Sequence, residues 1–114
     1  MIIQFHTDAN ISGTQELQAE VKDVVSSTLD HLSERISRVE VHVTDENGKK
    51  GGLNDIRCVM EARVEGRQPT AVTHHASSVS EAVAGGAEKL LRSLEHALGR
   101  VNDRRAHDSI KREP

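Results

Sequence analysis

The sequence has very few aromatic residues and very few cysteines. Its 114 residues include one Phe, no Trp, no Tyr and a single Cys, so the core must be built from Val, Leu, Ile, Ala and Met. The near absence of aromatic side chains argues against a protein that binds single-stranded nucleic acid by stacking its bases. One cysteine cannot form an internal disulfide, which fits a reducing compartment such as the cytoplasm.

Long hydrophobic runs are also lacking. No apolar stretch approaches the roughly 20 residues needed to cross a bilayer. The first residues lack the basic and apolar regions of a secretory signal. A chain of this length is expected to form one domain. We therefore expect a soluble, cytoplasmic protein that does not interact with membranes.

The chain has no overall excess of positive charge, but its charges are unevenly distributed. The formal net charge is −3. Residues 1–88 contain 8 basic and 14 acidic side chains, whereas residues 89–114 contain 7 basic and 4 acidic ones. An anionic partner is therefore expected to bind near the carboxyl end of the chain.

Hydrophobic periodicity predicts six secondary-structure elements. Apolar residues alternate over 1–7, 36–44, 56–65 and 70–76, and they recur every three or four positions over 14–32 and from residue 79 onward. Alternation is typical of strands with one buried face, and the longer spacing is typical of amphipathic helices. The predicted order is β-α-β-β-β-α.

Particular residues mark the ends of the two helices. Ser12 or Thr14 is expected to cap the first helix, and Ser78 with Glu81 has the spacing of a capping box for the second. In the second helix, Gly86 lies on the apolar stripe and predicts a close approach to its packing partner. Gly99 either ends this helix or weakens it.

The element order predicts an α+β fold with a four-stranded mixed sheet and both helices packed on one face. The first two strands are expected to be parallel through a right-handed crossover, and the last three to form an antiparallel meander. This domain is expected over residues 1–101. Residues 102–114 have little apolar content and are expected to form a flexible charged tail.

Several segments resemble one known family in residues as well as in element order. They are MIIQFHTD at 1–8, RVEVHVTDENG at 38–48, CVMEAR at 58–63, SVSEAV at 78–83 and EKLLRSL at 88–94. The family comprises the ribosome hibernation-promoting factors and ribosome-associated inhibitor A proteins, also called sigma-54 modulation or ribosomal subunit interface proteins. The resemblance covers about residues 1–100, and this chain looks like a short, divergent form.

Members of this family bind the small ribosomal subunit in the channel used by messenger and transfer RNA. The resemblance implies a ribosome-associated factor that binds rRNA phosphates, promotes hibernation and inhibits translation under stress or in stationary phase. Such binding is dominated by electrostatics and weakens as salt rises. The sequence has no recognisable set of nucleophile, base and oxyanion donor, so we expect no enzyme, cofactor or small-molecule substrate.

The expected rRNA contacts lie mainly on the second helix. The resemblance places them at Lys89 and Arg92, with Arg100 as a further contact, and His96 lies on the same helical stripe. Arg104 and Arg105 either extend this basic surface or belong to a solubilising tail. The full set is Lys89, Arg92, His96, Arg100, Arg104 and Arg105, with Lys49 and Lys50 as an auxiliary contact from the loop after the second strand.

A protein-interaction module is the alternative function. The outward face of the first helix is acidic, and strand 70–76 is polar enough to lie at a sheet edge. These two surfaces would bind a basic protein or form a homodimer by edge pairing.

Four histidines and the cysteine are further candidates for functional residues. His6 and His42 are expected to point outward near the carboxyl ends of adjacent strands, with His75 joining them if the sheet curls. Imidazoles in such a group suggest Zn²⁺ or Ni²⁺, but we recognise no carboxylate or Cys at a ligand spacing and predict no metal site. His74 is expected to face the helices, partly buried, and Cys58 to be a buried small hydrophobe.

Overall fold

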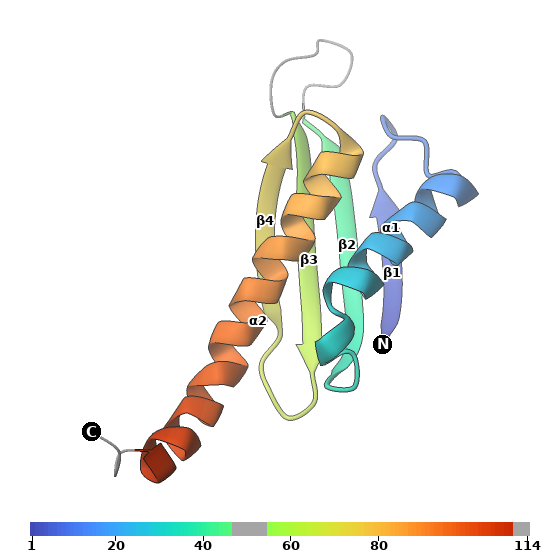
Figure 1. Ribbon diagram of the computed structural model, residues 1–114. Coiled ribbons are helices and arrows are strands. Elements are labelled where there is room, and N and C mark those ends of the chain that lie inside the picture. The colour runs from blue at the N-terminus through green and yellow to red at the C-terminus, as the bar shows by residue number, and fades with distance from the viewer. Residues whose placement is uncertain (47–54, 111–114) are drawn as a thin grey trace.

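The chain folds into one four-stranded sheet with two helices across one of its faces (Figure 1). The computed structural model describes residues 1–46 and 55–110, with side chains as far as Gly99. The elements are β1 (Ile2–Thr7), α1 (Gln15–Thr28), the 3₁₀ helix η1 (Asp30–Leu32), β2 (Ile36–Asp45), β3 (Ile56–Val64), β4 (Thr70–Ala76) and α2 (Val79–Ile110). The predicted α+β class and element order are confirmed.

The sheet has the predicted mixed topology. Its strands lie in the order β1-β2-β3-β4. β1 is parallel to β2, with His6 opposite His42, and the pairs β2–β3 and β3–β4 are antiparallel. A parallel neighbour requires a crossover connection, which α1 supplies. β1 and β4 are therefore the two edges of the sheet.

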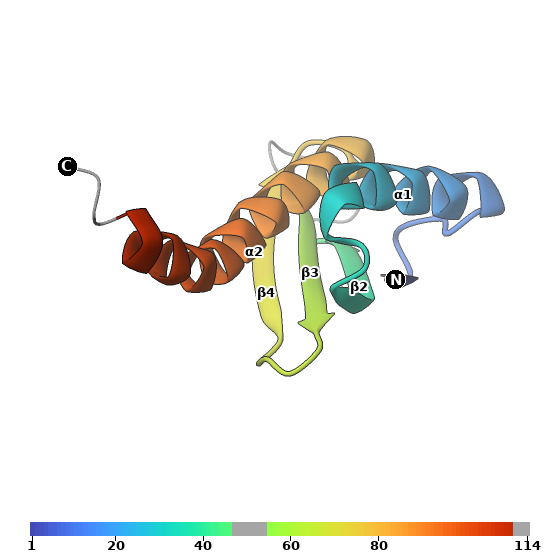
Figure 2. The ribbon, with the colours of Figure 1, turned by 60° about the horizontal axis from the view of Figure 1, so that its bottom comes forward.

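The core lies between the sheet and the two helices. Alternate residues of the central strands point toward the helices, as the period-two pattern predicts. The fully buried strand residues include Val39, Val41, Val43, Cys58 and Met60, and the helices contribute Val21, Val25, Ala87, Leu90 and Leu94. Both helices lie on the same side of the sheet (Figure 2). The side chains of the opposite face are consequently exposed or half-buried.

Both helices begin at a hydroxyl side chain. Thr14, and not Ser12, caps α1, because its Oγ1 accepts a hydrogen bond at 3.1 Å from the backbone N–H three residues later. Ser78 Oγ accepts a bond at 3.2 Å from the backbone N–H of Glu81. The Glu81 carboxylate accepts a bond from Ser77 Oγ at 2.9 Å. Of the predicted capping box, the hydrogen bond to the Ser78 hydroxyl is thus formed, while the Glu81 carboxylate binds the neighbouring Ser77 hydroxyl.

Two glycines allow α2 to lie close to the sheet. A Cβ added at Gly86 would lie 3.2 Å from the Sγ of Cys58, which confirms the predicted close approach. A Cβ at Gly85 would overlap the imidazole ring of His74, a second close approach that the periodicity did not indicate. His74 is half-buried and faces α2, as expected from its strand position.

α2 continues past Gly99 to Ile110 and extends beyond the end of the sheet (Figure 1). A glycine inside a helix costs only about 1 kcal/mol relative to alanine, so it does not by itself end a helix. Residues 102–110, expected as part of a flexible tail, therefore have a helical backbone, and residues 111–114 lie outside the described part. The domain boundary at residue 101 stays a prediction. None of the described helices has the length and hydropathy of a membrane span.

Candidate functional site

One side of the exposed surface of α2 carries basic residues and faces β4. The Nζ of Lys89 donates a hydrogen bond at 2.9 Å to the backbone oxygen of Thr73 in β4. This contact shows that the Lys89 side of the helix faces β4. Arg92 and His96 follow at spacings of three and four, so they lie on the same side, and both are exposed. We call Lys89, Arg92 and His96 the basic edge.

The other side of α2 is acidic and faces α1. Glu88 and Glu95 lie seven residues apart and share this side. Glu95 Oε2 lies 3.1 Å from His31 Nε2 in η1, and Ser80 Oγ donates a hydrogen bond at 2.9 Å to Glu20 Oε1 in α1. The exposed acidic residues of α1 and the segment after it are Glu16, Glu20, Asp23, Asp30 and Glu34. Glu88 and Glu95 thus lie toward α1 and Lys89 toward β4, and Arg92 lies at the border between these two sides, since it is four residues from Glu88 and three from Glu95.

The two cations of the basic edge differ in their intramolecular contacts. Lys89 uses one of the three N–H donors of its ammonium on Thr73 and keeps two for an external acceptor. Among the described residues, Arg92 has no hydrogen bond or ion pair within the chain. Its guanidinium is therefore available for bidentate binding to a phosphate.

A groove of about 320 Å³ lies between α2 and the turn that joins β3 to β4. Leu94, Ala97 and Leu98 line its helix side, and Arg67, Gln68 and Pro69 line its turn side. Arg67 is exposed, so it adds a cation beside α2 that the sequence analysis did not include. The sequence marked 66–69 only as a turn, and nothing in that motif indicates which helix the turn lies against.

The remaining predicted contacts are not located by the structure. Arg100, Arg104 and Arg105 belong to α2, but their side chains lie beyond the described ones. Lys49 and Lys50 lie outside the described residues. Of the predicted set, the structure therefore brings together Lys89, Arg92 and His96.

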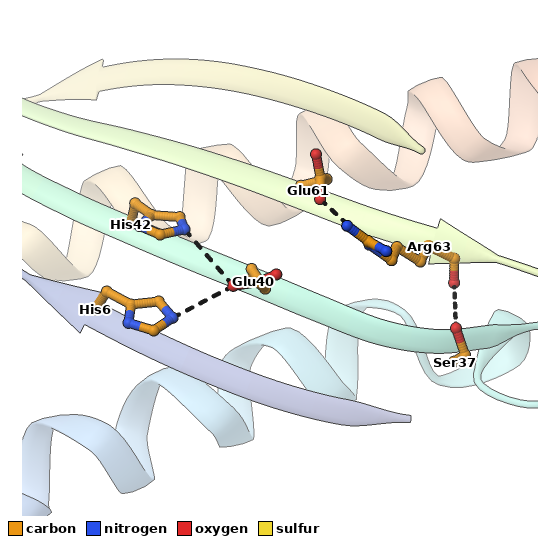
Figure 3. Close-up of polar contacts among 6 residues, drawn as sticks. All are labelled: His6, Ser37, Glu40, His42, Glu61 and Arg63. Atoms are coloured by element: carbon orange, nitrogen blue, oxygen red, sulfur yellow. Dashed lines mark hydrogen bonds and ion pairs between the residues drawn. The ribbon is translucent and has the colours of Figure 1, made fainter. Parts of the chain in front are cut away.

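The open face of the sheet holds a cluster of two histidines and one carboxylate (Figure 3). The rings of His6 and His42 are stacked, with centroids 4.5 Å apart and an interplanar angle of 15°. Glu40 Oε1 lies 3.4 Å from His6 Nε2 and 3.9 Å from His42 Nε2. His75 does not join the cluster, because β3 lies between its strand and β2, and its Nε2 lies 2.9 Å from Glu46 Oε1 instead.

The prediction that no carboxylate lies at a ligand spacing from these histidines is wrong, because Glu40 lies beside both of them. Residues two apart in a strand point to the same face, so Glu40 and His42 share the open face of β2. The parallel register then places His6 beside them. The spacing was visible in the sequence, but the register was not.

Cys58 is fully buried, as predicted. Burial raises the pKa of its thiol to about 12. A thiol in this environment stays protonated at neutral pH and is a poor nucleophile.

Comparison with known proteins shows similarity only among solved structures. No protein-family model and no curated protein matches the chain. The N-terminal domain of Protein Y from Thermus thermophilus matches with a TM-score of 0.67 and 11% identity, over 84% of this chain and 98% of that one. A ribosomal subunit interface protein from Coxiella burnetii matches with a TM-score of 0.65 and 13% identity, over 87% of this chain and 99% of that one. The chain thus has the fold of a ribosomal subunit interface protein, and its resemblance to that family is confirmed at the level of the fold.

Proposed function

We propose that this protein is a ribosome-associated factor that binds the small ribosomal subunit, promotes hibernation and inhibits translation under stress or in stationary phase. The observation that carries the proposal is the likeness in fold to a ribosomal subunit interface protein, which extends over 99% of that chain. This role requires occupancy of a site and no catalysis. It also places the protein in the cytoplasm.

The basic edge is the surface best suited to rRNA. Lys89 and Arg92 present cationic donors on one side of a helix, and phosphate oxygens are the acceptors that such donors bind. Arg100, Arg104 and Arg105 extend the proposed contact along α2, and Lys49 and Lys50 add a contact from the segment that follows β2 in the sequence. With one Phe and no other aromatic residue, recognition rests on phosphates and shape.

The acidic flank, formed by α1 and by the side of α2 that carries Glu88 and Glu95, limits how rRNA can approach the protein. The carboxylates of α1 and of the neighbouring side of α2 repel phosphates, so rRNA approaches from the β4 side. A protein with a net charge of −3 therefore binds through a narrow footprint.

Sedimentation with purified small subunits tests the proposal. Reversing both cations in Lys89→Glu plus Arg92→Glu is expected to weaken binding by roughly tenfold or more, because two phosphate contacts become repulsive. The matched control is Lys22→Glu plus Arg35→Glu, which makes the same change in net charge at two exposed positions outside the basic edge. The control is expected to bind within about twofold of the unmodified protein, since exposed charges more than a Debye length apart are largely screened.

Two results would contradict the proposal. One is unaltered binding by the Lys89 and Arg92 variant. The other is an equal loss in both double variants, which would mean that net charge and not the basic edge governs binding.

The alternative is a protein-interaction module or homodimer that uses the acidic first helix and the β4 edge. On that edge, Lys89 already occupies the backbone oxygen of Thr73, which hinders the addition of another strand. A pull-down after RNase treatment that retains a protein partner and no rRNA would favour this alternative over ribosome binding.

A further inference from the structure

We propose that His6, Glu40 and His42 form a binding site for a divalent transition-metal ion, of the class of Zn²⁺, Ni²⁺ or Cu²⁺. The site lies on the open face of the sheet, away from α2, and is independent of the proposed ribosomal role. Figure 3 shows both imidazoles directed at the same carboxylate.

The backbone positions the three side chains. Glu40 and His42 point to the same face of β2 because they are two residues apart. His6 lies directly opposite His42 in the parallel pairing of β1 with β2. The sheet therefore holds the three Cβ atoms in place, and only side-chain torsions remain to be fixed when a metal binds.

The distances suit coordination. One potential ligand atom from each residue lies within 4.8 Å of the other two. Ligands about 2.0–2.1 Å from a tetrahedral metal lie about 3.4 Å from one another. The separation of Glu40 Oε1 from His6 Nε2 already is 3.4 Å, and its separation from His42 Nε2 is 3.9 Å. Small rotations of the rings would bring all three atoms around one ion.

The kind of ligand selects the kind of metal. Two imidazoles and one carboxylate bind borderline divalent ions such as Zn²⁺, Ni²⁺ and Cu²⁺, whereas Mg²⁺ and Ca²⁺ prefer oxygen ligands. Three protein ligands also leave a coordination position open on the solvent side. The side chains of His6 and His42 are 47% and 50% exposed, so an ion can enter without any movement of the backbone.

The neighbouring charges leave Glu40 available to the histidines. Its cross-strand neighbour Glu61 lies 3.6 Å from Arg63, which partly neutralises that second carboxylate (Figure 3). Glu40 Oε1 lies between the two stacked imidazoles, so a cation bound by both rings would also contact a carboxylate.

Isothermal titration of untagged, metal-free protein with ZnCl₂ tests the site. We expect one Zn²⁺ per chain and no measurable heat with MgCl₂. His6→Ala and His42→Ala are each expected to weaken Zn²⁺ binding by about tenfold or more, because each removes a ligand. His75→Ala is the matched control, since His75 is 45% exposed and also lies beside a carboxylate, but outside the cluster.

A second readout separates loss of the site from loss of the fold. Zn²⁺ is expected to raise the midpoint of thermal unfolding of the unmodified protein and of His75→Ala, and to leave that of the two cluster variants unchanged. Binding that is equally strong in His6→Ala plus His42→Ala would overturn the proposal. An equal loss in His75→Ala would also overturn it, because the ion would then be held by scattered surface histidines.

Discussion

Neighbouring residues of α2 have opposite roles because the helix turns by about 100° per residue. Glu88 lies on the acidic flank, whereas Lys89 reaches the backbone of Thr73 in β4. Gly85 and Gly86 lie against the sheet, where a side chain would meet His74 or Cys58. The structure shows which atoms Gly85, Gly86 and Lys89 lie against, while periodicity indicates only a helical face.

The glycines of α2 are expected to respond differently to alanine. Gly99 has open space around its Cβ position, so Gly99→Ala is expected to stabilise the protein by up to about 1 kcal/mol through helix propensity. Gly86→Ala gains the same propensity but presses on buried Cys58, and overpacking a core costs about 1–3 kcal/mol. We therefore expect no gain, or a loss. Urea unfolding of both variants checks this contrast, and equal stabilisation would contradict it.

The buried thiol predicts how stability depends on pH at the alkaline end. The pKa of Cys58 rises from 9.0 to about 12 on folding, so the unfolded chain loses this proton first. Below pH 9 the thiol is protonated in both states, so its stabilising effect on the folded protein is fully present. As pH rises from 9 toward 12, only the unfolded chain loses the proton and the free energy of unfolding falls. From pH 9 to 10 it lowers the free energy of unfolding by about 1 kcal/mol.

Comparison with Cys58→Ala isolates this effect. The variant is expected to be less stable at pH 8, where the thiol is protonated in both states, and to lack this part of the alkaline decline, as measured by urea unfolding at pH 8, 9 and 10. Identical pH profiles for both proteins would contradict the assignment. Rapid reaction of the native thiol with a disulfide reagent at pH 8 would contradict it as well.

At the scale of elements, the helices depend on single capping residues where they begin. Thr14→Ala removes the acceptor for the first turn of α1 and is expected to lower the free energy of unfolding by about 1 kcal/mol. Ser12→Ala is the control, because Ser12 is exposed and does not cap the helix. Thermal or urea unfolding measures both. Equal losses in the two variants would show that the cap is misassigned.

The strands and their order were predictable from the sequence because one face of each strand is buried. The alternation of Val39, Val41 and Val43 indicates both a strand and the face of that strand that is buried. The end of α2 was less predictable, since Gly99 is compatible both with a helix end and with a weakened helix. The choice of Thr14 over Ser12 depended on backbone geometry, which residue type alone does not fix.

The candidate sites were predictable only in part, for a related reason. The spacing of Lys89, Arg92 and His96 indicated one helical side, but not that this side faces β4. The meeting of His6 with Glu40 depends on strand register, and the nearness of Arg67 to α2 depends on where a turn lies. These are contacts between segments distant in sequence, which periodicity cannot supply.

At the scale of the whole molecule, charge is separated across the fold. The acidic α1 and the acidic side of α2 meet, while the basic edge borders β4 and continues in sequence toward a carboxyl end rich in arginine. This separation reconciles a net charge of −3 with an anionic partner. A uniform distribution of the same charges would disfavour RNA.

The salt dependence of binding to purified small ribosomal subunits tests the central claim most directly. The logarithm of the association constant is expected to fall linearly with the logarithm of the KCl concentration. Its slope should be about −2 or steeper, because at least two or three cations replace counterions on rRNA phosphates. Arg92→Ala is expected to make this slope shallower by about 1. A slope near zero, or a slope that Arg92→Ala leaves unchanged, would contradict binding through the basic edge.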